Sequence, residues 1–360
     1  MLRFLFKCVL IIACFVATTG HAEPAYEFYD LGLLETDYSE AYCINDLGQT
    51  VILYEFQGQH RIGIWEVKQG ITLIDLPQVA IPVRINNNGQ IAGNYTSANN
   101  HCRGFFWDPI EGFADIGTLG GDTTQVSDLN DLGQVVGASS TGKKGQQISY
   151  GEETHAFVWQ KGRLKDLGTL PDALGTPTDF SSAVAINNLG QIVGCSEYVM
   201  VHKGKRIRGP NQAVIWTDNG PPREILYQDS HKTESRAYGI NDKGEITMDG
   251  PHPDSKQYRQ FLYKEDSGVF INIHGGRFNQ GINNGGYAIA EGSTSTPGGS
   301  LRIPNGQIID RNEFLYKDIQ AKNTWKKLER INGVNNRGEI VGKGHTWYGE
   351  GHAFLIRPKS

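Results

Sequence analysis

The sequence is poor in cysteine. It has five cysteines in 360 residues, and Cys8 and Cys14 lie in an N-terminal segment that we expect to be removed. The other three, Cys43, Cys102 and Cys195, are too few for a disulfide framework. One bridge beside a single free thiol is an alternative, and we favour three buried thiols.

Long apolar runs are missing after the first 22 residues. Residues 1–22 combine Arg3 and Lys7, an apolar run over 8–17 and a small residue, Ala22, before Glu23. This pattern predicts a Sec signal peptide over 1–22. A lipobox that ends at Cys14 is a minor alternative, with lipidation at that cysteine. No later stretch reaches the roughly 18 apolar residues of a membrane span, so we expect 23–360 to be exported and soluble, either secreted or periplasmic.

An excess of positive charge is also missing. Without Arg3 and Lys7, 32 basic residues face 39 acidic ones, which gives a net charge of −7. This balance argues against nucleic-acid binding. Motifs such as HExxH, GxSxG and an EF-hand loop do not occur, and we expect no metal and no cofactor.

What the sequence does have is a repeat. The motif Asn-[Asn/Asp]-x-Gly occurs seven times, and successive copies lie 41, 44, 57, 54, 42 and 52 residues apart. Asn or Asp favours the start of a type I turn, and Gly takes the left-handed position that closes it. Each copy therefore predicts a tight hairpin, with an anchor asparagine at Asn45, Asn86, Asn130, Asn187, Asn241, Asn283 or Asn335.

A second submotif follows each hairpin and predicts a third strand. In six copies this strand ends at an aromatic residue, namely Trp65, Trp107, Trp159, Trp216, Tyr263 or Tyr316. We expect these aromatics to lie between blades. A fourth strand is expected to end near Leu167 in the third copy and near Leu328 in the sixth. The seventh copy lacks a fourth strand, and residues 26–32 match that pattern. The sequence thus predicts an all-β, seven-bladed β-propeller over 23–360, closed by the N-terminal strand.

Three strings, HAFVW (155–159), DIGTLGG (115–121) and INNLGQIVG (186–194), resemble the HAF-repeat family of predicted extracellular bacterial proteins. The resemblance spans the mature chain and implies export without implying an activity. His155 and His352 keep the histidine of the motif, whereas five copies have another residue there. We therefore expect no catalytic or metal role for this histidine.

The connections between the second and third strands vary in length and should share one face of the ring. We expect this face to carry any function. Small residues two positions before most anchor asparagines suit a crowded channel. Arg84 and Asp128 depart from this pattern in adjacent blades and are expected to line the channel as a pair.

Two insertions on the variable face supply candidate ligand-binding residues. Residues 202–209 hold four cations that suit an anionic ligand, and 141–155 hold an aromatic ring and carboxylates that suit a sugar. The plain alternative is that both are solvated hairpin ends. The candidate residues are Tyr150, Glu152, Lys203, Lys205, Arg206 and Arg208.

These observations favour a non-enzymatic binding scaffold for a protein or an anionic glycan. One alternative is an extracellular polysaccharide hydrolase or lyase that uses carboxylates of the variable face, for which Asp122, Glu152, Asp179 and Asp310 are candidates. The other is a structural surface protein without a ligand pocket.

Overall fold

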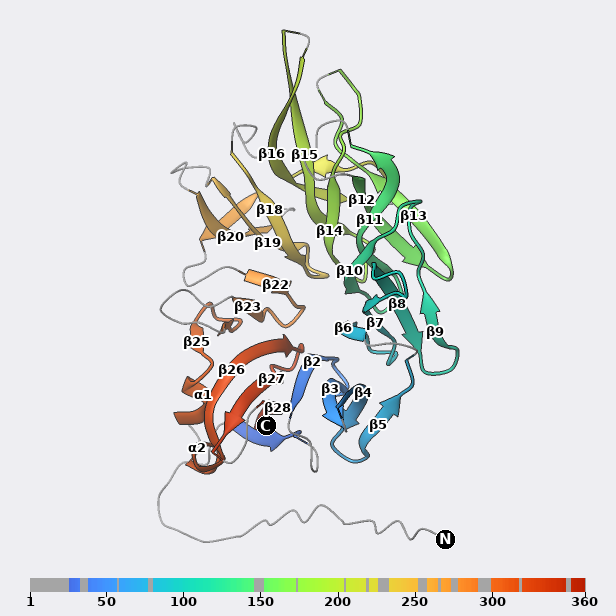
Figure 1. The fold of residues 1–360 in the computed structure, drawn as a ribbon. Coiled ribbons are helices and arrows are strands. Elements are labelled where there is room, and N and C mark those ends of the chain that lie inside the picture. The colour runs from blue at the N-terminus through green and yellow to red at the C-terminus, as the bar shows by residue number, and fades with distance from the viewer. Residues whose placement is uncertain are drawn as a thin grey trace.

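Seven four-stranded antiparallel sheets stand side by side around a central channel in a computed structural model of the chain (Figure 1). The predicted signal peptide lies outside the residues that the structure describes. Among the residues that the structure describes, no helix has the length and apolar character needed to span a membrane. The described residues are 26–32, 38–56, 58–76, 80–145, 152–172, 174–203, 205–217, 220–225, 233–251, 258–264, 267–272, 278–290, 299–316, 319–347 and 351–359.

The seven sheets are the blades of a β-propeller, and each begins with a strand beside the channel. The innermost strands are β2 (Ser39–Ile44), β6 (Ala80–Ile85), β10 (Thr124–Leu129), β14 (Ser181–Ile186), β18 (Arg236–Ile240), β22 (Phe278–Ile282) and β26 (Trp325–Val334). The second strands are β3 (Thr50–Phe56), β7 (Ile91–Thr96), β11 (Val135–Lys144), β15 (Ile192–His202), β19 (Glu245–Pro251), β23 (Ala288–Ala290) and β27 (Ile340–Thr346).

The outer half of each blade completes the predicted four-stranded unit. The third strands are β4 (Gln59–Glu66), β8 (Cys102–Asp108), β12 (Glu152–Gln160), β16 (Lys205–Trp216), β20 (Tyr258–Lys264), β24 (Ser300–Arg302) and β28 (His352–Pro358). The outermost strands are β5 (Gly70–Ile74), β9 (Gly112–Asp115), β13 (Arg163–Gly168), β17 (Arg223–Glu224), β21 (Val269–Asn272), β25 (Ile308–Asp310) and β1 (Tyr26–Asp30).

The N-terminal strand closes the ring, as predicted. β1 pairs with β28 from Tyr26↔Pro358 to Asp30↔Phe354, and it is the fourth strand of blade seven. Leu31, which is 1 % exposed, packs between blades seven and one beside residues of both. This arrangement covers the β28 edge that an open array would leave unpaired.

Blade six corrects one part of the prediction. The segment that ends at Tyr316 is the short helix α1 (Glu313–Tyr316), followed by α2 (Ile319–Thr324), and Leu328 belongs to β26 of blade seven. The third and fourth strands of blade six are β24 and β25, joined by a turn at 303–306. Pro304, Asn305 and Gly306 favour such a turn. Phe314 is fully buried, so the apolar residues of the motif serve the core from a helix.

The core lies between the blades. Trp216 is fully buried and packs against Val136 and Val158 of the preceding blade, while Trp159 is 5 % exposed. These two positions confirm that the recurring aromatics at the strand ends serve inter-blade packing. Free thiols occur at all three described cysteines, and Cys43 and Cys195 are buried. Cys102 is exposed, which corrects the expectation of three buried thiols, because it opens β8 at the edge of its blade.

All seven anchor turns have the predicted geometry. In blade three the Asn130 side-chain oxygen accepts hydrogen bonds from the backbone N–H groups of Leu132 and Gln134, at 3.1 and 2.9 Å. Gly133 has a φ of 72°, and the equivalent glycine of every other turn also has a positive φ. The repeated glycine is therefore needed for its left-handed backbone.

The anchor asparagines also join the blades in a ring, because each side-chain amide donates a hydrogen bond to a carbonyl of the next blade. Asn130 Nδ2, for example, lies 3.0 Å from the carbonyl oxygen of Asn187. Six of the seven amides reach the next anchor asparagine, and Asn283 instead reaches Val334.

A second ring is formed by the residues that follow the anchors, in which a backbone N–H donates to the side chain of the next blade. Asp46 donates to Asn87 at 2.9 Å, and Asn87 donates to Asp131 at 2.8 Å. Asp and Asn alternate around this ring except where Asn284 precedes Asn336, since an odd ring cannot alternate throughout. At that step the donor shifts to the N–H of Gly285. The members are Asp46, Asn87, Asp131, Asn188, Asp242, Asn284 and Asn336.

Candidate functional site

The variable face, which carries the connections between second and third strands, lies opposite the anchor turns because adjacent strands are antiparallel. Two of its hairpins are long. β11 and β12 remain paired out to Lys144↔Glu152, and β15 and β16 remain paired out to His202↔Lys205. The second hairpin projects furthest from the ring in Figure 1. Any ligand that approaches this face over blades three and four meets these hairpins first.

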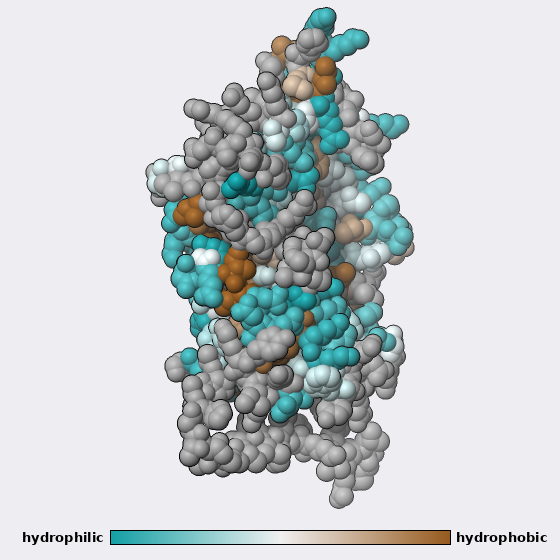
Figure 2. All heavy atoms as spheres, turned by 90° about the vertical axis from the view of Figure 1, so that its left-hand side faces the viewer, coloured by the Kyte–Doolittle hydropathy of each residue, from teal (hydrophilic) through white to brown (hydrophobic). Residues whose placement is uncertain are grey.

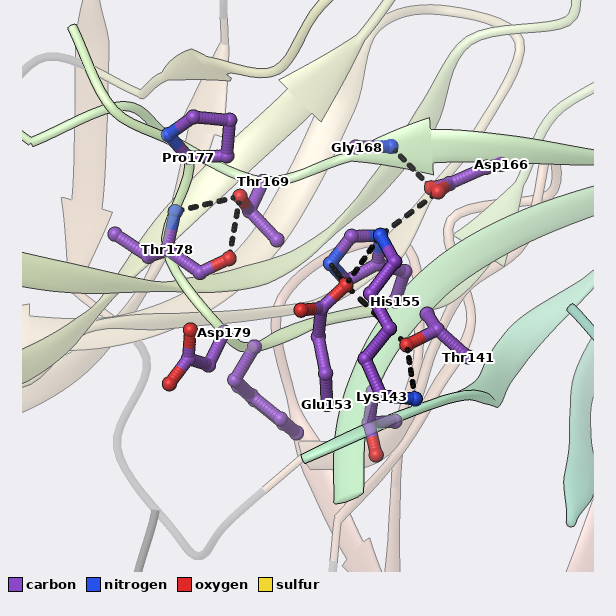
Figure 3. A network of polar contacts seen from close by, with 12 residues as sticks. Thr141, Lys143, Glu153, His155, Asp166, Gly168, Thr169, Pro177, Thr178 and Asp179 are labelled. Carbon is purple, nitrogen blue, oxygen red and sulfur yellow. Dashed lines mark hydrogen bonds and ion pairs between the residues drawn. The ribbon is translucent and has the colours of Figure 1, made fainter. Parts of the chain in front are cut away.

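Charged side chains gather between blades three and four, below the two hairpins. We call them the blade three–four cluster. Its members come from five strands and one link, and Figure 3 shows a part of it around His155. The cluster consists of Lys143, Glu153, His155, Asp166, Asp172, Asp179, Glu197, Arg206 and Arg208.

His155 lies between two carboxylates (Figure 3). Its Nδ1 atom is 2.8 Å from Asp166 Oδ2 and its Nε2 atom is 3.1 Å from Glu153 Oε1. Lys143 Nζ lies 3.5 Å from the same Glu153 oxygen. Although burial raises the pKa of Asp166, hydrogen bonds from His155 and the Gly168 N–H outweigh burial and hold that pKa below its usual value. A hydrogen bond to Asp166 thus fixes the imidazole on its Nδ1 side, and Glu153 lies within ion-pair distance of Nε2.

Contacts equivalent to the one between His155 and Asp166 occur in other blades, where the surroundings of His155 in blade three are not repeated. His352 Nδ1 lies 3.2 Å from Asp30, and Arg103 Nη2 lies 3.0 Å from Asp115. Asp30, Asp115 and Asp166 each also accept a glycine N–H two residues on. A guanidinium thus takes the same place in blade two, so the His155–Asp166 contact is a repeated structural link between the third and fourth strands.

Two arginines of the blade-four hairpin pair with buried carboxylates. Arg206 Nε lies 3.0 Å from Asp172 Oδ2, and its Nη2 donates to the carbonyl of Pro177 at 3.0 Å. Arg208 Nε lies 2.7 Å from Glu197 Oε1. The side chains of Asp172 and Glu197 have no exposed surface. Both arginines therefore tie the hairpin to the body of the propeller.

The two carboxylates respond differently to their surroundings. Backbone N–H groups of Thr176 and Leu174 donate to Asp172, and together with Arg206 they lower its pKa although burial opposes them. At Glu197, burial dominates and raises the pKa, although Arg208 and the Asp179 N–H lower it. Asp179 also accepts the N–H of Thr154 on its carbonyl, and it therefore spans the junction between the two blades.

The structure separates the predicted ligand-binding residues. Tyr150 lies outside the described residues. Glu152 is exposed at the start of β12 opposite Lys144. Lys203 and Lys205 are exposed near the end of the blade-four hairpin, whereas Arg206 and Arg208 are held in the ion pairs described above. Their role in binding a ligand stays a prediction.

The structure places the candidate carboxylates on different elements. Asp122 is exposed on the link into blade three, Asp179 is buried between blades three and four, and Asp310 ends β25 of blade six. Sequence reasoning missed Glu197 and Asp172. One signal was available in the sequence. Glu197 lies in the second strand just after the repeated motif, next to an arginine-rich insertion.

A small cavity lies in the central channel behind the two hydrogen-bonded rings. Its volume is about 170 Å³, less than the several hundred Å³ of an ordinary small-molecule site. Arg84 Nε and Asp128 Oδ1 pair across its lining at 2.8 Å, as predicted, and the Ile186 N–H donates to Asp128 Oδ2 at 3.0 Å. In the described part of the chain, no three His, Cys, Asp or Glu side chains are grouped to hold a metal ion.

Comparison with known proteins shows the fold. No protein-family model matches the chain, and no curated protein matches it. Among solved structures it is similar to the β-propeller domain of the trilobed protease of Pyrococcus furiosus, with 14 % identity, a TM-score of 0.54 and coverage of 91 % of this chain and 95 % of that one.

Two lyases are similar at the same level. Oligogalacturonate lyase in complex with manganese has 9 % identity and a TM-score of 0.59, and the match covers 94 % of this chain and 95 % of that one. Virginiamycin B lyase of Staphylococcus aureus has 11 % identity and a TM-score of 0.53, over 92 % and 99 % of the two chains. These likenesses show that the chain is a β-propeller, and at such identities they show the fold alone.

Proposed function

We propose that this protein is an exported, non-enzymatic binding scaffold that docks a protein partner on the hairpin formed by β15 and β16. The observation that carries the proposal is the anchoring of this hairpin. Arg206 and Arg208 pair along one of its strands with the buried Asp172 and Glu197, while Lys203, Lys205 and Ile207 stay exposed. Export rests on the signal-peptide pattern of residues 1–22.

The anchoring ion pairs support a positioning role. Buried ion pairs add little net stability, since the cost of removing two charges from water offsets their attraction. They do select one orientation, because any other leaves a buried charge unpaired. A binding element that is fixed before it meets its partner loses less conformational entropy on association. The ion pairs along the hairpin therefore suit a preorganised arm.

The end of the hairpin has the mixed chemistry of a docking surface. Met200 and Ile207 face each other across the strands and are 39 % and 45 % exposed. Lys203 and Lys205 flank this apolar pair and are also exposed. Hydrophilic and hydrophobic residues meet at the top of the molecule in Figure 2, where the hairpin ends. The partner we expect offers an apolar depression beside acidic groups.

A hydrolase or lyase is the competing function, because two of the similar propellers are lyases. In this chain the most catalytic-looking group is His155 between two carboxylates. Its contact with Asp166 has counterparts at His352 and Arg103, which favours a structural role for the imidazole. The channel cavity is also small for a sugar substrate. Both points support the binding scaffold.

Photo-crosslinking tests the proposal. We expect a photoreactive amino acid at position 207, incubated with extracellular extract of the producing organism, to give a discrete adduct. Excess unlabelled wild type should compete for the adduct, and Lys203→Glu/Lys205→Glu protein should not. Arg206 is unsuitable for this test, since reversing its charge also breaks the contact with Asp172.

The control carries the same photoreactive group at position 189 on the opposite face, where Leu189 is 68 % exposed. An equal adduct at 189, equal competition by the double variant or no adduct at 207 would contradict docking on the hairpin. Turnover of a polysaccharide by the wild type, lost in His155→Gln protein with an unchanged melting curve, would favour the enzyme instead.

A further inference from the structure

Trp347 stands apart from the other five tryptophans of the chain. It is 56 % exposed, whereas Trp159, Trp216 and Trp325 are at most 5 % exposed. Its backbone N–H donates to the carbonyl of Thr324 at 3.2 Å, so the chain is held at this point. Trp347 follows the end of β27 on the variable face of blade seven. An exposed indole offers a flat apolar surface to a ligand.

Polar side chains continue from Trp347 along β27. His345 Nε2 lies 2.8 Å from Glu329 Oε2, and Lys343 Nζ lies 3.0 Å from the same oxygen. Alternate residues of a strand share a face, so Lys343 and His345 point the same way, and Trp347 is next in that series. The carboxylate of Glu329 therefore has Lys343 and His345 as partners on this face.

Arg330 ends this row of side chains. It lies opposite Lys343 on the neighbouring strand β26, and its side chain is 52 % exposed. Its guanidinium is 3.7 Å from Glu40 and 3.8 Å from Glu329, beyond hydrogen-bond distance. The Glu40 carboxylate accepts hydrogen bonds from Tyr38 and Asn332 instead. Within the described part of the chain, the guanidinium N–H groups of Arg330 thus make no hydrogen bond.

We infer that the row from Trp347 to Arg330, which we call the blade seven–one row, binds an acidic glycan, with one sugar ring stacked on Trp347 and a uronate carboxylate held by Arg330. The guanidinium presents a planar fork that matches a carboxylate. The apolar face of a pyranose ring suits an indole, and its hydroxyl groups suit His345, whose side chain is 22 % exposed. The inference goes beyond the proposed function and does not depend on the blade-four hairpin.

The spacing indicates an oligosaccharide. Trp347 follows Lys343 by four positions, which corresponds to about 13 Å along an extended strand. Because Arg330 lies opposite Lys343, the indole and the guanidinium are too far apart to hold one sugar ring. A nucleic acid fits less well, since its dense negative charge would meet a chain with a net excess of acidic residues.

Titration with defined oligosaccharides tests the inference. The probes are oligomers of galacturonate, of mannuronate and of glucuronate, each beside the same oligomer with its carboxylates reduced to alcohols. We expect at least one uronate oligomer to bind the wild type and to protect Trp347 from quenching by iodide. Trp347→Ala should weaken its binding at least about tenfold, and Trp347→Phe should restore most of it.

Arg330→Gln separates the acidic glycan from a neutral one. It should bring the affinity for the uronate oligomer down to that for its reduced counterpart, with an unchanged melting curve. The inference is overturned if no uronate oligomer binds, if the reduced oligomers bind the wild type equally well, or if Trp347→Ala binds as tightly as the wild type. Arg163→Gln, at an exposed arginine of β13 in blade three, is the matched control and should bind the glycan normally.

Discussion

The two faces of the ring use their polar side chains in different ways. On the turn face, the same atoms act in blade after blade: an anchor amide donates to the next blade, and a backbone N–H meets the next Asp or Asn side chain. On the variable face, the two junctions described above share little. Blades three and four meet through paired arginines and carboxylates, whereas blades seven and one meet around Glu40, Glu329 and Arg330.

This difference separates closure from recognition. A ring of seven similar joints has to repeat, because each joint must satisfy the same backbone groups at the same angle. The strict motif on the turn face is therefore explained by folding. Side chains on the variable face are free of that requirement beyond the strand ends, and they differ from junction to junction.

Removal of β1 should have the largest effect, because it breaks the ring itself. Deleting 26–32 leaves the β28 edge unpaired and removes Leu31 from the core between blades seven and one. The loss of apolar burial and backbone pairing should reach about 5 kcal/mol or more, comparable with the whole stability of a typical domain. Thermal unfolding followed by circular dichroism should lose its cooperative transition.

Addition of the deleted strand provides the control. A synthetic peptide of residues 26–32 should restore part of the cooperative transition in a concentration-dependent way. A deletion variant that melts like the wild type would show that the other strands close the ring without β1.

Much of the turn face could be predicted from the sequence. The αL glycines, the number of blades and the closing strand all follow from seven repeats and two complementary chain ends. Blade six could not be predicted, because the apolar spacing of residues 313–316 suits both a strand and a short helix. Only packing decides between them, and here Phe314 is buried from a helix.

On the variable face, the sequence predicted which segments would project and could not predict how they are held. The pair Arg84–Asp128 was predictable because both residues occupy equivalent positions in adjacent blades. The pair Arg208–Glu197 was not, since a bulge between Glu197 and Val199 shifts the strand register. A one-residue shift changes which side chains share a face, and no local pattern marks it.

Loss of one anchor amide should have the next largest effect. Asn130 is 4 % exposed, and its side chain donates to Gln134 and Asn187 and accepts from Leu132 and Gln134. Asn130→Ala leaves several buried partners unsatisfied and should cost about 2–4 kcal/mol of unfolding free energy. Urea denaturation measures it. Leu132→Ala, at an exposed site in the same turn, should change stability by less than about 0.5 kcal/mol.

Loss of the alternation between Asp and Asn in the second ring should have the next largest effect on stability. The Asn87 side-chain amide lies 3.4 Å from Asp46 Oδ2 and 3.0 Å from Asp131 Oδ2. Asn87→Asp would place three carboxylates in a row and should cost about 1–3 kcal/mol at neutral pH. Asn284→Asp should cost less, because Asp242 is its one acidic neighbour in the ring. Urea midpoints of the two variants give the comparison.

The pH dependence of Asn87→Asp follows from its neighbours. Two adjacent carboxylates would raise the folded-state pKa of the new aspartate, so its destabilisation is complete above that pKa and disappears as the pH falls toward the unfolded value near 4. Equal losses of stability for Asn87→Asp and Asn284→Asp at pH 7 would contradict a role for the alternation of Asp and Asn. A loss for Asn87→Asp that persists at pH 3.5, relative to the wild type, would contradict it as well.

The smallest expected effect compares one buried carboxylate from each face. Glu339, behind the anchor turn of blade seven, has a lowered pKa because hydrogen bonds from Arg337, Asn335 and Arg357 outweigh burial. Its stabilisation is complete above the ordinary value near 4.5 and is lost as the pH falls through the folded pKa. Glu197 has a raised pKa because burial dominates. Its destabilisation is complete above its folded pKa and fades as the pH falls from there toward 4.5.

The substitutions Glu339→Gln and Glu197→Gln should therefore change the dependence of stability on pH in different pH ranges. Relative to the wild type, Glu339→Gln should lose least below pH 4.5 and most at pH 7, as melting temperatures between pH 3 and 7 will measure. Glu197→Gln should lose least at pH 7 and relatively more on approach to pH 4.5, because the neutral wild-type side chain no longer carries the cost that the substitution removes. Parallel curves for the two variants would mean that burial does not govern Glu197, and the variable face would then hold its carboxylates by the same balance of hydrogen bonds as the turn face.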